Sequence, residues 1–173
     1  MVVLAPPAGL TPHVGTECWR LCKIPEFDRQ LVGQERGLND LTVDEYLRGR
    51  EAYTAGEKVR DPKVARSARK ALEDRFIKDA MGKMELNGTP LMEARRAAKT
   101  IAREKMSALA ALHNPDLFAG GKDIVSDFGD ARVNSSIGAQ WRGRIDGLDN
   151  AASKMGVDMR DGAKITARLE RCR

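Results

Sequence analysis

Aromatic residues, cysteines and long apolar runs are scarce in this sequence, and each shortage narrows the class of protein. Aromatic residues make up 5% of the chain, and this scarcity beside plentiful Ala, Leu and Arg favours helix over sheet. The three cysteines, Cys18, Cys22 and Cys172, include no C-x-x-C pair, so neither a disulfide framework nor a zinc ribbon is expected. No run of about 18 apolar residues occurs, and the apolar start is too short for a secretory signal, so neither a membrane span nor a signal peptide is expected.

The length and the charge of the chain point to one basic domain. The 173 residues suit a single domain with a buried core. The formal charge of +5 and the isoelectric point of about 9.3 favour contact with polyanions such as nucleic acid. A solubilising surface would have the same charge, so basicity alone does not decide between these two roles.

Proline and glycine divide the chain into two parts. Both are dense in residues 1–37, and this density predicts an irregular arm. Residues 38–173 are predicted to form a single compact domain of the mostly α class, with a loop-rich segment that holds the active site.

Two helix starts are clearly marked. Thr42 and Glu45 form the capping-box pattern, which predicts a helix over residues 42–55. Asp61 followed by Pro62 is a second start, because the carboxylate can cap a helix whose first residue needs no N–H. Apolar residues then recur every four positions and predict a helix that ends near residue 86.

A third helix is expected to begin at Thr89-Pro90 and to end near His113. Pro115 ends it, because proline disfavours the helical conformation in the residue before it and cannot donate a helical hydrogen bond. His113 is therefore expected at a helix C-terminus, where the partial negative charge of the helix dipole favours a protonated imidazole.

The last third of the chain is predicted to alternate loops and helices. Residues 120–134 lose the helical period and are rich in Asp and Gly, which is typical of a loop. Ser135 or Ser136 is expected to cap a helix that runs to about residue 155. A short final helix is expected over residues 161–171.

Phosphodiester hydrolysis requires a base for the attacking water, charge relief on the phosphate and help for the leaving oxygen. His113 and Asp116 stand three residues apart across the bend made by Pro115. Both side chains can therefore address one spot, through a metal ion or with Asp116 orienting the imidazole. This spacing alone is a weak motif, because two common polar residues often meet in this way by chance.

The surrounding residues make the motif more specific. The chain resembles the novel toxin 15 family of bacterial polymorphic toxins over about residues 38–155. The likeness rests on Ala111-Leu112-His113-Asn114-Pro115-Asp116, Ala119-Gly120-Gly121, Gly129-Asp130, Val133-Asn134-Ser135-Ser136-Ile137-Gly138, Gln140-Trp141 and Leu41-Thr42-Val43-Asp44-Glu45-Tyr46-Leu47.

The resemblance implies a function. That family is described as largely α-helical, is defined by an HxxD motif, and includes type VI secretion effectors that degrade DNA inside rival bacteria. By position the catalytic residues are His113 and Asp116. The resemblance also implies a cognate immunity protein that binds the toxin in the cytoplasm of the producing cell. It further implies that the toxin is secreted into the cytoplasm of the target cell. Residues 1–37 would then be the end of a delivery region.

Other residues near the motif are candidates for supporting roles. Asp130 is the first choice for a further metal or water ligand, although an Asp beside a Gly is equally common in turns; Asp123 and Asp127 rank below it. Asn134 and Gln140 could bind phosphate or satisfy buried backbone groups. Arg142 and Arg144 are candidates for substrate phosphate. Trp141 is expected in the core rather than as a stacking surface for bases.

These observations predict a divalent-metal-dependent endonuclease acting on DNA, with Mg²⁺ held by Asp116 and Asp130. Two alternatives stay open at this stage. One is a ribonuclease toxin in which His113 works without a metal through the 2′-hydroxyl. The other is a non-catalytic nucleic-acid-binding module.

Overall fold

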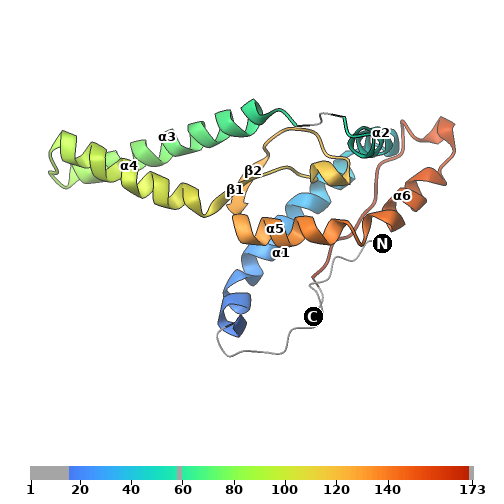
Figure 1. Ribbon diagram of the computed structural model, residues 1–173, viewed down its shortest axis with the longest axis horizontal. Coiled ribbons are helices and arrows are strands. Elements are labelled where there is room, and N and C mark those ends of the chain that lie inside the picture. Colours follow the sequence, from blue (N-terminus) through green and yellow to red (C-terminus); the bar gives the residue numbers. More distant parts are fainter. Residues whose placement is uncertain (1–15, 58–59, 172–173) are drawn as a thin grey trace.

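The computed structural model describes residues 16–57 and 60–171, and it is mostly helical, as the sequence predicts (Figure 1). The six helices of the described residues are α1 (Thr16–Asp40), α2 (Val43–Thr54), α3 (Pro62–Leu86), α4 (Leu91–Ser107), α5 (Ala131–Trp141) and α6 (Ile145–Ser153). Two short strands, β1 (Leu109–Leu112) and β2 (Asp127–Asp130), pair antiparallel. Single 3-10 turns, η1 (Leu117–Ala119) and η2 (Val157–Met159), complete the fold. No helix of the described part is both long and apolar enough to cross a membrane.

The molecule has two visible parts, a body and a projecting arm. Helices α3 and α4 pack on each other as an antiparallel hairpin, residues 62–107, which extends away from the other elements (Figure 1). We call this hairpin the arm. Its own small core is formed by Leu72 of α3 with Ala94, Ala98, Ala102 and Met106 of α4. The row of alanines lets the two helix backbones approach closely.

The main core lies in the body and contains no arm residue among those described. It joins α1, α2, α5, α6 and the segment after α6 around Trp141, Tyr46 and Leu38, which are fully buried. The expectation that Trp141 belongs to the core is confirmed. The arm is therefore held to the body mainly where α3 contacts β1 and where the chain runs on from α4 into the sheet.

Helix α1 corrects the prediction of an irregular segment through residue 37. Residues 16–37 belong to a helix, with Pro25 inside it, while residues 1–15 lie outside the described part. Leu31, Gln34 and Leu38 are buried on one side of α1 at helical spacing. The glycines that suggested a loop are positions where this helix lies against the backbone and side chain of Asn114.

The two helix starts read from the sequence are confirmed. At α2 the Thr42 hydroxyl accepts from the Glu45 backbone N–H, and the Glu45 carboxylate accepts from the Thr42 N–H. At α3 the Asp61 carboxylate accepts from the Lys63 N–H, with Pro62 as the first helical residue. Both sets of orphan N–H groups are satisfied locally, which explains why the sequence predicts them well.

The third helix is shorter than predicted. α4 ends at Ser107, and the next residues form β1, which pairs with β2 in the register Leu109 to Asp130 and Leu112 to Asp127. The pairing partner lies in the segment expected to be a loop. A strand takes the place of the last helical turns because residues 127–130 supply the hydrogen bonds from far along the chain.

The helices of the C-terminal third differ from the prediction in two ways. Asp130, not Ser135 or Ser136, caps α5, because its carboxylate accepts from the N–H groups of Arg132 and Val133. α5 and α6 are separate helices instead of one.

Residues 163–169 are extended rather than helical. Ile165, Ala167 and Leu169 are buried at alternate positions, which is the period of a strand. This segment bonds to α1 and to the start of α2: the Ile165 N–H donates to the Leu41 carbonyl, and the Leu169 N–H donates to the Glu35 carboxylate. The expected final helix over residues 161–171 is therefore wrong.

Candidate functional site

A cleft of about 710 Å³ lies where the arm meets the sheet. Its walls come from three places: the start of α3 with the residue Arg60 before it, strand β1 with His113, and α5. The lining residues are Arg60, Pro62, Ala65, Arg66, Arg69, Lys70, Glu73, Ala110, Ala111, His113 and Asn134. Four of these are Lys or Arg and one is a carboxylate, so the cleft is suited to an anion.

His113 directly follows β1, so the expected position at a helix C-terminus is wrong and the helix-dipole argument does not apply. Its side chain is 5% exposed. The Nδ1 atom lies 3.1 Å from the Ile124 carbonyl oxygen. Because a carbonyl oxygen can only accept, Nδ1 is the donor in this contact, and in the neutral form of the ring Nε2 is the nitrogen with the lone pair.

The His113 Nε2 atom is buried and has no hydrogen-bond partner among the described residues. A buried polar atom without a partner costs about 1 to 3 kcal/mol, so each one calls for an explanation, and a catalytic role is one of these. His113 therefore lines a cationic cleft and keeps one ring nitrogen free of hydrogen bonds to the described residues. This is the arrangement that a general base or a ligand requires.

Asp123 is the carboxylate beside the imidazole. Its Oδ1 atom lies 3.7 Å from His113 Nδ1 and is itself buried without a hydrogen-bond partner in the described structure. Its Oδ2 atom accepts from the backbone N–H of Asp61 at the start of α3. A carboxylate in this position stabilises the imidazolium that forms when Nε2 takes up a proton. From the sequence, Asp123 is a weaker candidate than Asp130 for a further metal or water ligand.

The loop from His113 to Asp116 is held by Gln34, a buried residue of α1 that sequence reasoning missed. The Gln34 Nε2 group donates to the His113 carbonyl at 2.8 Å and to the Asn114 side-chain oxygen at 3.1 Å. Its Oε1 atom accepts from the Asp116 N–H at 2.7 Å. One amide thus fixes three of the four motif residues. The one available sequence signal was a polar residue inside the apolar stripe of a helix.

Asp116 begins the η1 turn and its Oδ1 atom accepts from the Phe118 N–H at 2.9 Å. Within the described residues, no hydrogen bond or ion pair joins it to His113. Its Oδ2 atom faces Gly138 of α5, where an added Cβ would lie 3.8 Å away. The ring of His113 is therefore oriented by Ile124 and Asp123, and Asp116 orders the turn that follows the motif.

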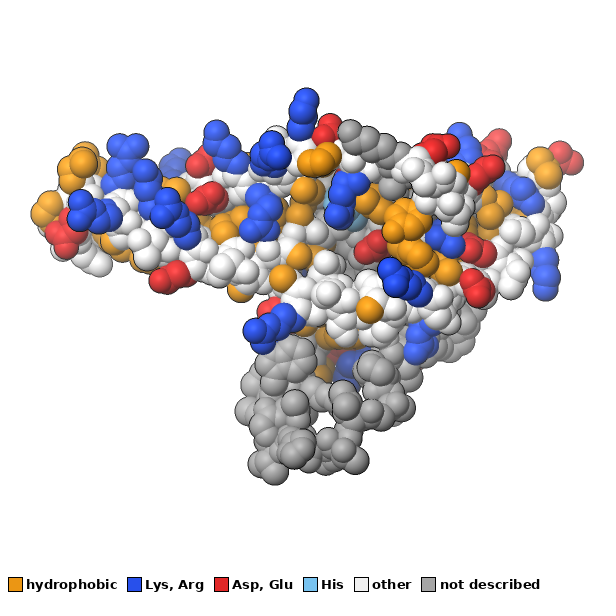
Figure 2. Space-filling model, in the orientation of Figure 1, with side chains coloured by type: hydrophobic (Ala, Val, Ile, Leu, Met, Phe, Trp, Pro, Cys, Tyr) orange, Lys and Arg blue, Asp and Glu red, His pale blue; other side chains and the backbone are white. Residues whose placement is uncertain are grey.

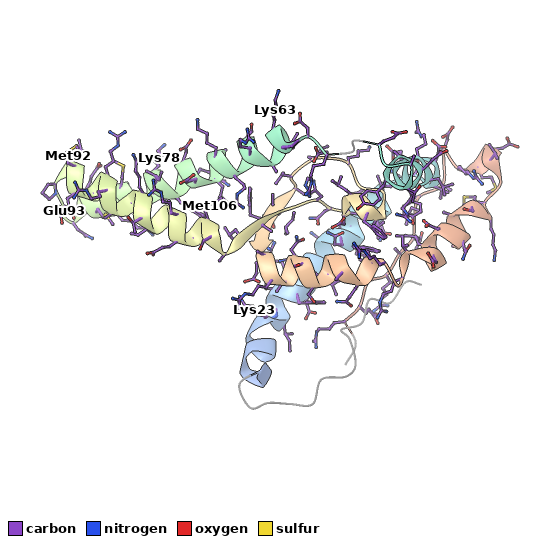
Figure 3. All side chains as sticks on the ribbon, viewed as in Figure 1. Lys23, Lys63, Lys78, Met92, Glu93 and Met106 are labelled. Atoms are coloured by element: carbon purple, nitrogen blue, oxygen red, sulfur yellow. The ribbon has the colours of Figure 1, made fainter. Side chains whose placement is uncertain are left out.

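Asp130 is fully engaged as a structural residue. Its Oδ1 atom caps α5, and its Oδ2 atom pairs with Lys23 of α1 at 2.5 Å; Lys23 is labelled beside the start of α5 in Figure 3. Partial burial alone would raise the pKa of Asp130, but the Lys23 ammonium and the backbone N–H groups hold it below its ordinary value. Both oxygens are occupied, which does not suit the metal-ligand role expected from the sequence.

The other predicted site residues separate into two groups. Asn134 lies on α5 and lines the cleft together with His113. Gln140 donates to the Ser136 carbonyl and is not a lining residue. Arg142, at the end of α5, is exposed, and Arg144 is half-buried; neither lines the cleft.

The cationic wall of the cleft comes instead from α3. Arg66 and Lys70 are exposed. Arg69 is partly buried and donates to the Leu109 and Met106 carbonyls, which joins the arm to the sheet. These residues lie more than 40 positions from His113 in the sequence, so only the fold brings them to the motif.

The described residues contain no group of three His, Cys, Asp or Glu side chains that could hold a metal ion. Magnesium, however, is commonly bound through one or two carboxylates, with substrate phosphate and water as the other ligands. Asp116 fits that requirement as a single ligand, because its Oδ2 atom has no hydrogen bond or ion pair within the described part. Asp130 does not fit it.

Comparison with known proteins identifies a family. The family model described as Novel toxin 15 matches residues 22–170, which is well over half of the chain and includes most of α1. No curated protein matches the chain. The match begins earlier and ends later than the resemblance read from the sequence. Both added segments belong to the main core, and α1 also holds the motif loop through Gln34.

Proposed function

This chain belongs to the novel toxin 15 family, and from that premise we propose that it is a nuclease toxin that hydrolyses phosphodiester bonds of DNA in rival bacteria. The observation that carries the proposal is His113, whose buried Nε2 atom has no hydrogen-bond partner among the described residues and which lines a cleft with four cations. A neutral imidazole with a free nitrogen and a cationic wall are what phosphodiester hydrolysis requires.

In the proposed reaction His113 is the general base. Its Nε2 atom takes a proton from a water molecule, the water oxygen forms a bond to phosphorus, and the bond from phosphorus to the leaving sugar oxygen breaks. The leaving oxygen takes its proton from solvent. The Asp123 carboxylate offsets the charge of the imidazolium, since its Oδ1 atom lies 3.7 Å from Nδ1.

The phosphate is bound by the side chains on α3. Arg66 and Lys70 line the cleft and are exposed, so they can offset the additional negative charge of the transition state. Divalent-metal dependence is part of the proposal. Asp116 is the residue that would hold a Mg²⁺ ion, which would add charge relief on the same phosphate.

The biological setting of the proposal follows from the toxin family. A toxin active on DNA must be neutralised in the cell that makes it, and we propose a cognate immunity protein as that partner. We also propose delivery by a bacterial secretion system, such as type VI, into the cytoplasm of the target cell. Residues 1–15, outside the described part, would belong to the delivery region.

The test is plasmid cleavage by the purified protein with Mg²⁺ or with EDTA. We expect nicked and linear DNA with Mg²⁺, and at least a hundredfold slower cleavage by His113→Ala. Asn150→Ala, on the exposed side of α6, is the matched control and should cut like the wild type. Equal cutting by His113→Ala would contradict the assignment. Cleavage of RNA but not DNA, unaffected by EDTA, would select the ribonuclease instead.

A further inference from the structure

The positive charge of this protein is concentrated in the arm. Residues 62–107 contain twelve Lys and Arg but only six Asp and Glu, which gives the arm a formal charge of +6. The whole chain has a formal charge of +5, so everything outside the arm is close to neutral. A hairpin that projects from the body thus accounts for the basic character of the molecule (Figure 1).

The arm cations are exposed and not neutralised. Eleven of the twelve are exposed, namely Lys63, Arg66, Lys70, Arg75, Lys78, Lys83, Arg95, Arg96, Lys99, Arg103 and Lys105. Within the described residues, none of them forms an ion pair, although the body contains many such pairs. Figure 2 shows Lys and Arg side chains along the visible face of the arm. The six Asp and Glu residues of the arm are close enough in sequence to form ion pairs with these cations. The lack of ion pairs is therefore not due to a lack of acidic residues.

The cations follow the helix axis in a row. Arg95, Lys99 and Arg103 stand four residues apart on α4, so they share one side of the helix at intervals of about 6 Å. The acids of α4, Glu93 and Glu104, fall outside this row. On α3 the cations continue through Lys70 to Arg66, both of which line the cleft that contains His113. Exposed cations are therefore present along both helices of the arm, from Arg95 near its tip to Arg66 at the cleft.

The arm is not built to stack bases. Phe76 is its one aromatic residue, and this ring is half-buried beneath the Lys105 ammonium, 5.1 Å from the ring centroid. Proteins that bind single strands use exposed aromatic rings on which successive bases stack. Contacts from Lys and Arg to phosphates alone suit the regular backbone of a duplex and carry no sequence information.

We propose that the arm is a duplex-binding element that lies along the phosphate backbone of double-stranded nucleic acid and holds one strand at the His113 cleft. The proposal rests on the proposed nuclease function and adds the form of its substrate. A helix of the length of α3, 25 residues, spans about 37 Å, which is close to one turn of duplex, roughly 10 base pairs. The protein should therefore bind duplexes of about 20 base pairs or more, which is about two turns, much more tightly than duplexes of about 6 base pairs.

The test measures binding separately from cleavage. In a His113→Ala background, a triple variant of the row, Arg95→Gln, Lys99→Gln and Arg103→Gln, is compared with a triple variant of body cations, Arg48→Gln, Lys154→Gln and Arg168→Gln. Both remove three charges from exposed positions. Circular dichroism confirms that both are folded. Fluorescence anisotropy with a 30-base-pair DNA duplex is recorded over a range of salt concentrations.

We expect the arm variant to bind the duplex on the order of tenfold or more weakly, and the slope of log affinity against log salt to fall by about 3. The body variant should keep the affinity and slope of its parent. Equal losses in both triples would overturn the proposal, as would equally tight binding of a 30-nucleotide single strand.

Two further measurements separate the possible failures. Hydrolysis of bis(p-nitrophenyl) phosphate, which is too small to reach the arm, should be unchanged by the arm triple in the catalytically intact chain. If the wild type cleaves no phosphodiester but the arm still binds duplex, the nuclease proposal fails and the arm proposal stands.

The arm tip exposes Leu86 and Met92, 89% and 75% accessible, and Met92 lies at the far end in Figure 3. Arm-dependent sedimentation with phosphatidylglycerol vesicles, without duplex binding, would assign the arm to a membrane surface instead.

Discussion

Gly37 on α1 tests directly whether the loop from His113 to Asp116 is positioned by this helix. A Cβ atom added at Gly37 would lie closer than 3.0 Å to the Asn114 carbonyl group and to the Pro115 nitrogen. These are backbone atoms of the motif loop, so no side-chain rotation can relieve the contact. Gly37→Ala must therefore push the loop away from α1 or shift α1 itself.

The expected effect follows from two opposing quantities. Alanine inside a helix is favoured over glycine by about 0.5 to 1 kcal/mol. Overpacking a well-packed site costs about 1 to 3 kcal/mol, and here the neighbour is backbone, so the upper end applies. We expect a net destabilisation of about 2 to 2.5 kcal/mol, which lowers Tm by roughly 4 to 10 °C in a domain of this size.

Gly82 on α3 is the matched control, because a Cβ there would meet nothing within 4 Å. Gly82→Ala should raise Tm by roughly 1 to 4 °C, since only the helix propensity changes. Thermal unfolding by circular dichroism and plasmid cleavage are measured for both variants. Gly37→Ala should also lose most of its cleavage rate. A Gly37→Ala protein as stable and active as Gly82→Ala would refute the packing of α1 against the motif.

Three other predictions concern residues around the same loop and its supports. Gln34→Leu leaves the His113 carbonyl and the Asp116 N–H unpaired, and should destabilise the protein by about 2 to 4 kcal/mol in urea unfolding while lowering kcat more than it raises KM. Thr42→Ala removes the side-chain half of the capping box and should cost about 1 kcal/mol without changing cleavage; a neutral result would contradict the cap. The Arg29 guanidinium holds the pKa of Glu26 at about 2, below its ordinary 4.5, so this stabilisation is present above pH 4.5 and is lost as the pH falls toward 2. Unfolding free energies measured over that window should fall less steeply for Glu26→Gln than for the wild type.

Local chemistry could be read from the sequence, and long-range pairing could not. The starts of α2 and α3 were predictable because Thr42 and Asp61 satisfy backbone N–H groups within three residues of themselves. Strand β1 was taken for helix because Ala and Leu suit a helix, while its partner lies at residues 127–130. Helix α1 was missed because Gly33 and Gly37 were read as breakers, whereas they are the positions where Asn114 approaches.

In the candidate site, too, local features were predictable from the sequence and contacts between distant residues were not. His113 was identifiable from its motif, and Asn134 lies beside it in the cleft. Gln34 is 79 residues from His113 in sequence, and the cations of α3 are also distant, so no local pattern connects them to the motif. Asp130 was the first choice over Asp123 as a further ligand, but its oxygens are used to cap α5 and to pair with Lys23.

Residues 163–169 are synthesised after the motif that they indirectly support. Gln34 holds the motif from α1, and α1 is in turn held by residues 163–169, through the Leu169 N–H on Glu35 and the side chain of Asn39 on Ala167. These residues leave the ribosome some 50 positions after His113. While the chain is being synthesised, the motif therefore emerges before the segment that secures its support. In the proposed toxin, the loop that carries His113 would therefore gain its full support only late in synthesis.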